Sequence, residues 1–572
     1  MWFELPVASG EGQAQAAELP RIESTAYREL FRGRMSRALE QALHEHIRKR
    51  RWFRGKARVI KQIRCVDQLP LSRGETPTSL LILRVEYGSE LPEHYVLPVA
   101  FAPESRAESL IEEHPEAVIG HVRLTGRGDG GRGGRDGGSR RTGLLYDPTS
   151  TAELGRALWP MLGRKKVVSG QGTLTSEPLR ALRKLVTEAD GSVDLEPWIA
   201  SVEQSNSSMF FGHEVALKIF RQLESGENPD VEIITHLTER KFPNIAPVLA
   251  TFRYDGGELE HATLGMAQKF VSSVGDCWDM TLEWLGRSFE SALSLAHSDE
   301  QIERPPPNLV EASRQQVPES VAQLTGGFLQ LVQLLGERTA ELHLALADPD
   351  AGPQFKPEPF AGHYQRAMLQ AARDRLARAM QLLRKQLASL PESVMPLAEQ
   401  VLSQREDLRQ SLSSLTRTKI EAARIRGHGD LHLGQVLYDG RDFVYIDFEG
   451  EPAMSMGVRR LKRPALYDVC GMLRSFHYAM TRALHDDHVR PEDRARIRPW
   501  AEAWHDWVCA TYLGAYLKRA GDAPFVPRSR EGLEALIHIH LLDKCAYELS
   551  YELNNRPDWV QVPLEGLRTL AG

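Results

Sequence analysis

The sequence predicts an α+β protein with strands in its first half, helices in its second half and a β-hairpin inserted among those helices. Up to about residue 272, short β-prone runs alternate with helical patterns. From about residue 275, apolar residues recur mostly at three- and four-residue steps, as in amphipathic helices. Two apolar runs at 436–438 and 443–448 flank the Gly-containing segment 439–442, which is typical of a hairpin.

With 572 residues the chain is too long for one compact core, so several structural units are expected. We divide it into a tail or linker (1–20), an N-terminal cap subdomain (21–124), a flexible Gly/Arg-rich loop (125–142), an intermediate subdomain with an N-lobe (143–272) and a helical C-lobe (273–572). The Gly/Arg-rich segment is almost free of apolar side chains, so nothing in it offsets the entropy of ordering its backbone.

Composition limits the kinds of partner. The net charge of −6 argues against a protein whose binding is dominated by nucleic-acid phosphates. No uninterrupted apolar run is long enough to span a bilayer, so no membrane partner is expected. The five dispersed cysteines lack CxxC spacing and predict reduced thiols. Together these features predict a soluble cytoplasmic protein.

The first half is predicted to form small sheets braced by helices. A helix is expected at 24–50, capped by Ser24 or Thr25. Strands are expected at 59–66, 79–86 and 94–101. Further along, the pattern predicts helices at 153–162 and 177–188, a strand pair at 198–204 and 209–220, a helix at 231–239 and strands at 245–254 and 260–271.

The second half is predicted to be helical around the hairpin. The clearest apolar stripe runs from Phe328 to Leu346. After the hairpin, helices are expected at 465–484, 499–520 and 533–553. Asp468 opens the first of these and is expected to cap it or to brace a metal-binding carboxylate.

Three polar side chains stand at fixed offsets around the hairpin: Asp430, Gln435 and Asp447. A hairpin with Gln435 at its start and Asp447 at its end brings both back towards Asp430. This arrangement matches phosphoryl transfer, in which a catalytic Asp is followed by an amide and a carboxylate that share Mg²⁺. His428 and Glu449 flank the set as candidate substrate-site or structural residues. The simpler interpretation is a surface hairpin with solvated acidic ends.

A cation is needed to hold nucleotide phosphates, and Lys218 in the apolar strand EVALKIF is the candidate. Such a lysine needs an oriented carboxylate. Glu232, fourteen residues later, is the favoured partner, with Glu224 and Glu227 as rivals. The alternative is a lysine whose ammonium reaches solvent.

A polar turn at 204–208 is the candidate cover for the phosphates, since hydroxyls, an amide and backbone N–H groups can bind anions. A plain β-turn has the same sequence pattern. The candidate nucleotide-binding residues, besides Lys218 and Glu232, are Ser205, Asn206, Ser207, Gln268, Phe270 and Val271.

The acceptor site is predicted on one helix near the C-terminus. Lys544, Tyr547, Glu548 and Tyr551 are spaced by three, four and seven residues and therefore share a face. Planar polar groups beside an aromatic platform suit a sugar. An ordinary amphipathic helix with tyrosines in the core is an equally good interpretation.

Several motifs together resemble those of bacterial maltokinases. They are HGDLHLGQ (428–435) and IDFEGEP (446–452), with EQSNSS, LKIF and NPDVE upstream, RWFRGKAR near the N-terminus and YELSYELNNRPDWVQVPL near the C-terminus. The similarity covers roughly residues 24–565. It implies a bilobal protein-kinase-like fold of the aminoglycoside-phosphotransferase type. It also implies ATP- and Mg²⁺-dependent phosphorylation of maltose to maltose 1-phosphate, which feeds α-glucan (glycogen) synthesis from trehalose.

The resemblance further implies roles for matching residues: Asp430 as catalytic base, Gln435 and Asp447 as Mg²⁺ ligands and Lys218 as the phosphate-binding lysine. The opening MWFELP resembles the end of a trehalose synthase, which suggests that enzyme as a partner. The Gly/Arg-rich run at 125–142 and the segment 296–320 depart from the family pattern. Two alternatives stay open: a kinase of the same fold acting on another sugar, an aminoglycoside or choline, and a non-catalytic pseudokinase that scaffolds trehalose synthase.

Overall fold

The computed structural model describes residues 19–571 except 57, 89, 127–140, 164, 184–194, 200–205, 296–301, 414–417 and 487. These residues fall into two compact units. The N-terminal unit comprises residues 19–238 and 246–272, and the C-terminal unit comprises 239–245 and 273–571. Most of the Gly/Arg-rich run predicted at 125–142 lies outside the described residues.

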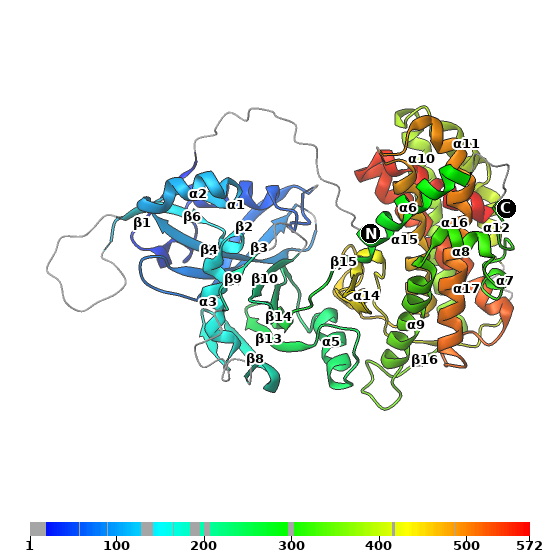
Figure 1. Cartoon of the computed structure of the whole chain (residues 1–572). Helices are drawn as coiled ribbons and strands as arrows, with labels where there is room; N and C mark the ends of the chain where they lie inside the picture. The colour runs from blue at the N-terminus through cyan, green and yellow to red at the C-terminus, as the bar shows by residue number, and fades with distance from the viewer. Residues whose placement is uncertain are drawn as a thin grey trace. The chain divides into compact units, whose positions relative to one another are not determined.

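The N-terminal unit begins with a mixed sheet in the order β1-β5-β6-β4-β3-β2, with β12 added on β4 (Figure 1). Its strands are β1 (Arg21–Ser24), β2 (Ile60–Pro70), β3 (Thr78–Tyr87), β4 (Glu93–Pro103), β5 (Val118–Leu124), β6 (Arg141–Tyr146) and β12 (Gln222–Leu223). Its helices are η1 (Tyr27–Leu30), α1 (Arg37–Lys49), η2 (Glu104–Arg106), α2 (Ala107–Glu113), η3 (Pro115–Ala117) and η4 (Pro148–Ser150). The apolar face of α1 is fully buried in the core of this sheet.

The helix predicted at 24–50 ends as expected, but it begins at Arg37, well after the predicted start. Ser24 belongs to β1 and pairs with Leu124 of β5, a partner one hundred residues away. Gly33 then adopts φ +66°, a left-handed conformation that interrupts a helix. Helix α1 starts only after Ser36, whose hydroxyl accepts a hydrogen bond from the Leu39 N–H at 3.2 Å. The predicted caps were therefore wrong.

A second sheet in the same unit has the order β7-β8-β13-β14-β11-β10-β9. Its strands are β7 (Val167–Ser169), β8 (Thr173–Pro178), β9 (Pro197–Trp198), β10 (Ser207–Phe211), β11 (Val215–Ile219), β13 (Val248–Gly256) and β14 (Leu259–Lys269), and its helices are α3 (Ala152–Leu162) and α5 (Pro229–Glu239). Leu80, Ile82 and Val96 of the first sheet share one hydrophobic core with this sheet. That shared core makes the cap and the N-lobe one compact unit.

Two segments of this sheet differ from the sequence prediction. The start of the helix expected at 177–188 lies in strand β8, because Glu177 pairs with Thr251 of β13. The strand expected at 209–220 is an antiparallel hairpin of β10 and β11, which turns at Gly212 with φ +54°. The first outcome depends on a pairing partner far along the chain, whereas the second had a local turn signal in Gly212.

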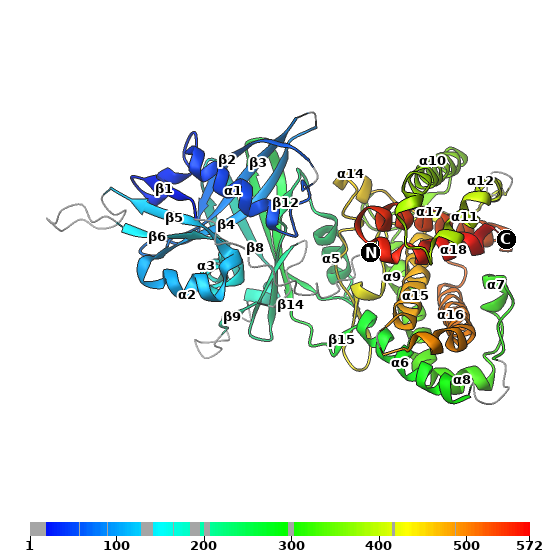
Figure 2. The same cartoon turned by 90° about the horizontal axis from the view of Figure 1, so that it is seen from above.

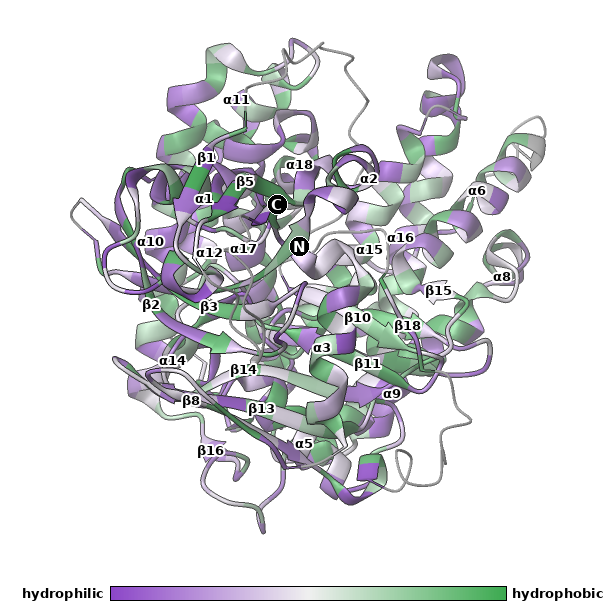
Figure 3. Cartoon of the chain, turned by 90° about the vertical axis from the view of Figure 1, so that its left-hand side faces the viewer, coloured by the Kyte–Doolittle hydropathy of each residue, from purple (hydrophilic) through white to green (hydrophobic). Residues whose placement is uncertain are grey.

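The C-terminal unit is mainly helical (Figure 2). Its helices are α6 (Cys277–Leu295), α7 (Leu309–Ala312), α8 (Glu319–Thr325), α9 (Phe328–Leu346), α10 (Gly362–Gln386), η5 (Leu387–Ser389), α11 (Met395–Ser403), α12 (Arg405–Ser411), η6 (Leu433–Gln435), α14 (Met456–Arg459), α15 (Leu466–Leu484), α16 (Pro491–Ala520), α17 (Arg530–Asn555), η7 (Pro557–Trp559) and α18 (Gln561–Ala571). Helix α6 alternates hydrophilic and hydrophobic residues in Figure 3, the pattern of an amphipathic helix. None of the helices in the described residues combines the length and apolarity needed to cross a bilayer.

The predicted hairpin is present among these helices. Strands β18 (Val436–Tyr438) and β19 (Phe443–Tyr445) pair antiparallel, and β15 (Gly275–Asp276) adds a third strand. A separate pair is formed by β16 (Glu358–Pro359) and β17 (Ala423–Arg424). The α+β architecture, with a strand-rich first half and a mainly helical C-terminal region, is therefore confirmed.

Candidate functional site

The loop that carries Asp430 is held by Asp468, a buried residue in the first turn of α15. The Asp468 Oδ2 accepts the backbone N–H of His428 at 2.7 Å, and its Oδ1 accepts that of Gly429 at 2.9 Å. His343 Nε2 of α9 lies 3.2 Å from the same Oδ2. Burial acts to raise the pKa of Asp468, but His343, His428 and the Gly429 N–H outweigh it and lower the pKa. Asp468 thus opens a helix as predicted, but it braces the loop backbone.

His428 connects this loop to the end of the hairpin. Its Nε2 lies 2.9 Å from the carbonyl oxygen of Ile446, which can only accept, so Nε2 carries the proton. Its Nδ1 then accepts the backbone N–H of Asp430 at 3.4 Å. The ring also packs on Phe448 with a centroid distance of 4.7 Å. His428 therefore positions the Asp430 loop, and it does not line the pocket described below.

Gln435 and Asp447 come together as predicted. The Gln435 side-chain amide donates to Asp447 Oδ2 at 3.1 Å, and the Gln435 carbonyl accepts the Ile446 N–H at 3.1 Å. Asp447 has φ +64°, a left-handed conformation that is rare for a residue other than glycine and is often found at functional sites. Glu449, the other predicted flanking residue, lies 3.6 Å from the Arg459 guanidinium.

Amide and carboxylate oxygens are the ligands that Mg²⁺ prefers, and protein Mg²⁺ sites usually combine one or two such groups with substrate phosphates. Gln435 and Asp447 offer this donor set on adjoining side chains, with a carboxylate that accepts a bond from the amide. The pair therefore fits Mg²⁺.

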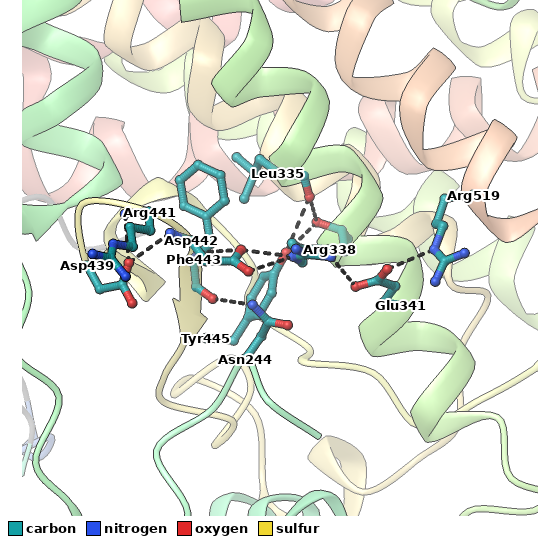
Figure 4. Close-up of polar contacts among 11 residues, drawn as sticks. Asn244, Leu335, Arg338, Glu341, Asp439, Arg441, Asp442, Phe443, Tyr445 and Arg519 are labelled. Carbon is teal, nitrogen blue, oxygen red and sulfur yellow. Dashed lines mark hydrogen bonds and ion pairs between the residues drawn. The ribbon is translucent and has the colours of Figure 1, made fainter. Parts of the chain in front are cut away.

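The hairpin is anchored to α9 and to the segment 239–245 (Figure 4). Arg338 of α9 donates from Nε to both carboxylate oxygens of Asp442, at 2.8 and 3.0 Å. The Asn244 side chain donates to the Phe443 carbonyl at 2.7 Å, and the Tyr445 N–H donates to the Asn244 carbonyl at 2.9 Å. These contacts fix the strands that carry Gln435 and Asp447 at their ends.

A pocket of about 420 Å³ lies beside Asp430 within the C-terminal unit. It is lined by Arg375, Asp430, Leu431, His432, Glu451, Tyr467, Gly471, Asp543, Lys544, Tyr547 and Glu548. The structure thus brings the predicted base together with Lys544, Tyr547 and Glu548 of α17. Tyr551 is not among the lining residues; its ring stacks on Tyr547 at 6.5 Å.

Ion pairs fix the charged groups of this pocket. Buried Arg474 of α15 donates to Glu548 Oε2 at 2.7 and 2.9 Å. Arg375 Nε lies 2.9 Å from Asp543 Oδ1. Burial acts to lower the pKa of Lys544, but Tyr467, Asp430 and Glu451 raise it above its usual value, so Lys544 is an ammonium. Burial lowers the pKa of His432 to about 3, so this ring is neutral at physiological pH.

Seven of the lining residues were not among the candidate site residues, and Leu431, His432 and Gly471 are three of them. Of the other four, Glu451 belongs to the motif IDFEGEP, and Asp543 is next to Lys544, so both had a local signal. Tyr467 directly precedes Asp468 on α15, which is a weaker local signal. Arg375 comes from the middle of α10, about 170 residues before Asp543 and Lys544 of α17, and only the packing of these two helices brings it to the pocket.

In the N-terminal unit, Lys218 lies on β11 as predicted, and its ammonium is 2.7 Å from Asp230 Oδ2. This contact is made by Asp230, whereas the sequence favoured Glu232. Both residues belong to the first turn of α5, and both are buried. The Asp230 carboxylate is fully buried, which makes the pairing electrostatically strong.

The predicted phosphate-covering turn is described only in part, because Ser205 lies outside the described residues. Asn206 is buried, and Ser207 begins β10. The Ser207 hydroxyl accepts a hydrogen bond from Arg221 Nε at 2.7 Å. Arg221, itself almost fully buried, also donates to Asp147 Oδ2 at 3.1 Å. Ser207 is thus linked through Arg221 to Asp147, which directly follows strand β6 of the first sheet.

The remaining candidate nucleotide contacts lie at and beyond the end of β14. The Gln268 side chain donates to the Ala246 carbonyl at 3.0 Å. The Phe270 N–H donates to the Glu214 carbonyl at 2.9 Å, and its ring packs edge-on against Phe210. Val271 follows without regular structure. Gln268 and the Phe270 N–H already serve as links between strands and turns of the sheet.

Comparison with known proteins gives three similarities. Residues 46–132 match the family "Maltokinase N-terminal cap domain". Glucosamine kinase of Mycolicibacterium smegmatis (strain ATCC 700084 / mc(2)155) is 24% identical over 383 residues, which are 65% of this chain and 78% of that protein. Glucosamine kinase of Streptacidiphilus jiangxiensis is 30% identical over 138 residues, 24% of this chain and 29% of that protein.

Solved structures give the same picture for the fold. A glucosamine kinase in complex with glucosamine, ADP and inorganic phosphate superposes with a TM-score of 0.55 at 18% identity, over 89% of this chain and 94% of that one. Crystal form A of glucosamine kinase gives a TM-score of 0.53, also at 18% identity, over 90% of this chain and 93% of that one. The chain therefore has a kinase-like fold, with a cap similar to that of maltokinases at its N-terminus.

Proposed function

We propose that this protein is an ATP-dependent sugar kinase that phosphorylates maltose and releases maltose 1-phosphate. The observation that carries the proposal is the pocket that brings the Asp430 carboxylate together with Lys544, Tyr547 and Glu548. Polar groups beside tyrosine rings suit a sugar with several hydroxyls, and a buried carboxylate at the same place suits activation of one of them. The kinase-like fold and the maltokinase-like cap support this interpretation.

Phosphoryl transfer depends mainly on positioning and charge neutralisation. In the proposed reaction, Asp430 orients the acceptor hydroxyl and accepts its proton. Lys218, oriented by Asp230, holds nucleotide phosphates. Gln435 and Asp447 hold Mg²⁺, which neutralises phosphate charge when it is bound. Asp468 and His428 keep Asp430 in place through the loop backbone.

A second candidate acceptor is glucosamine, because the similar proteins are glucosamine kinases. The charges of the pocket do not decide between the two sugars. Lys544 is an ammonium that would repel the ammonium of an amino sugar, whereas the Asp430 and Glu451 carboxylates would attract it. The maltokinase-like cap is the observation that favours maltose.

The test is a phosphotransfer assay with Mg-ATP and maltose, glucosamine, glucose or trehalose, with the product identified by phosphorus NMR. We expect turnover of maltose with phosphate on the anomeric oxygen and little turnover of the other sugars. Preferred turnover of glucosamine would show that glucosamine, and not maltose, is the acceptor, and the assignment as a sugar kinase would stand. No turnover of any sugar, with no binding of Mg-ATP, would contradict the kinase itself and leave a scaffold for trehalose synthase as the remaining function.

A variant tests the role of Asp430. Asp430→Asn keeps the shape of the side chain but removes the proton acceptor, so we expect kcat to fall by about 10²–10⁴-fold with nucleotide binding unchanged. Asp374→Asn is the matched control, since Asp374 lies on the exposed face of α10 and accepts a hydrogen bond from Gln370. Near-normal turnover of Asp430→Asn would contradict its assignment as the base.

A further inference from the structure

A second pocket of about 560 Å³ lies in the N-terminal unit and has no part in the proposed reaction. It is bounded by η1, by the connection between β2 and β3, and by the facing ends of β5 and β6. Its lining residues are Thr25, Ala26, Tyr27, Arg28, Pro70, Ser72, Arg73, Gly74, Pro77, Ser79, Leu124, Gly126 and Arg141. Three of them are arginines, and no Asp or Glu is among the lining residues that the structure describes.

The three arginines come from three separate segments. Arg28 lies in η1, Arg73 is exposed on the β2–β3 connection and Arg141 is the first residue of β6. Arg141 is held in place, because its guanidinium donates to the Glu75 carbonyl at 2.5 Å and lies 5.1 Å from the centre of the Phe101 ring. Such a restrained guanidinium loses little conformational entropy when it binds a ligand.

The rest of the pocket is rigid and partly apolar. The Tyr27 hydroxyl donates to the Val99 carbonyl at 3.0 Å, which fixes the ring against β4. The Ser72 hydroxyl accepts the Thr78 N–H at 3.0 Å and so holds the β2–β3 connection. Pro70, Pro77 and Leu124 add apolar surface. A ligand for this pocket therefore combines strong negative charge with an uncharged body.

We propose that this cap pocket binds a small organic phosphate, such as a sugar phosphate. Guanidinium groups recognise phosphate oxygens through paired N–H donors, and the lining residues that the structure describes include three of them and no carboxylate. The pocket shares no residue with the Asp430 pocket or with the Lys218–Asp230 pair. Two of its lining residues, Gly126 and Arg141, stand near the start and near the end of the Gly/Arg-rich run at 125–142.

The experiment is calorimetric titration of the full chain with glucose 1-phosphate, with glucose as the uncharged control. We expect the phosphate to bind and glucose not to bind at this site. Arg73→Gln should weaken binding of glucose 1-phosphate about tenfold, and Arg73→Lys less, because a lysine keeps the charge but not the paired donors. Arg141→Gln should weaken binding similarly. Thermal unfolding of each variant shows whether the fold is retained, and Arg73 is exposed enough to be replaced safely.

Two controls separate this site from the proposed active site. Lys218→Met and Asp430→Asn should leave the affinity for glucose 1-phosphate within twofold. Arg123→Gln, on exposed Arg123 of β5 that pairs with Glu23, should also leave it unchanged. Binding that is lost in the Lys218 or Asp430 variant but kept in the Arg73 and Arg141 variants would overturn the proposal. The absence of measurable binding would also overturn it. So would binding of a short RNA that depends on these arginines, if binding of glucose 1-phosphate does not depend on them.

Discussion

Asp468→Asn provides a sharp test of how the Asp430 loop is held. The substitution keeps the size of the side chain and changes one carboxylate oxygen into an NH₂ group. In the native protein, Oδ1 accepts the Gly429 N–H at 2.9 Å, and Oδ2 accepts the His428 N–H at 2.7 Å with His343 at 3.2 Å. An asparagine has one acceptor oxygen, so the backbone N–H of either Gly429 or His428 must face the new NH₂ group, which is itself a donor.

The expected cost follows from the lost bond. A buried hydrogen bond to a charged acceptor contributes about 1.5–3 kcal/mol, and its donor is left unsatisfied. We therefore expect the free energy of unfolding of the C-terminal unit to fall by about 2–3 kcal/mol at pH 7. The loop that carries Asp430 should also shift, and a displacement of about 1 Å at a reacting group costs on the order of 10²-fold in rate. Binding of Mg-ATP should stay within twofold.

The pH dependence has a definite sign. The pKa of Asp468 is lower in the folded protein than in the unfolded chain, so its stabilisation is fully present above the unfolded pKa of about 3.9 and is lost as pH falls through the folded pKa. The stability difference between the native protein and Asp468→Asn should be constant from about pH 5 to 8 and shrink below about pH 4.

The measurements are urea unfolding followed by tryptophan fluorescence at several pH values, together with steady-state kinetics on the preferred sugar. Asp407→Asn on the exposed face of α12 is the control for loss of one carboxylate. Normal kcat in Asp468→Asn, or a stability difference that persists unchanged at acid pH, would refute the argument that Asp468 holds the loop through its charge.

Three further variants test other contacts. Lys218→Met should raise KM for ATP at least about tenfold with KM for the sugar within twofold, and initial rates over both substrates measure this; an unchanged KM for ATP would contradict the role given to Lys218 and Asp230. Arg474→Met should lower the free energy of unfolding by about 3–5 kcal/mol, because it leaves the Glu548 carboxylate buried without its partner, and Arg474→Met with Glu548→Met should restore most of that loss in urea titrations. Asn244→Ala should cost about 1–2 kcal/mol in the same assay, since the Phe443 carbonyl loses its donor; no loss would mean that water replaces the amide.

Local patterns in the sequence were sufficient for several features. The apolar stripe of α9, the strand around Lys218 and the hairpin between Gln435 and Asp447 depend on side-chain periodicity and turn residues, which neighbouring positions encode. The same local spacing placed Lys544, Tyr547 and Glu548 on one face of α17. These features depend on residues that are close to each other along the chain.

The tertiary structure decided features that depend on distant partners. Ser24 joins β1 because a strand one hundred residues away pairs with it, and Arg375 reaches the pocket because α10 packs on α17. Asp230 meets Lys218 because packing in the N-terminal unit brings the first turn of α5 to strand β11. The sequence by itself determined which residue types the chemistry has available. Only long-range packing, which balances burial against chain entropy over the whole unit, decided which of them meet.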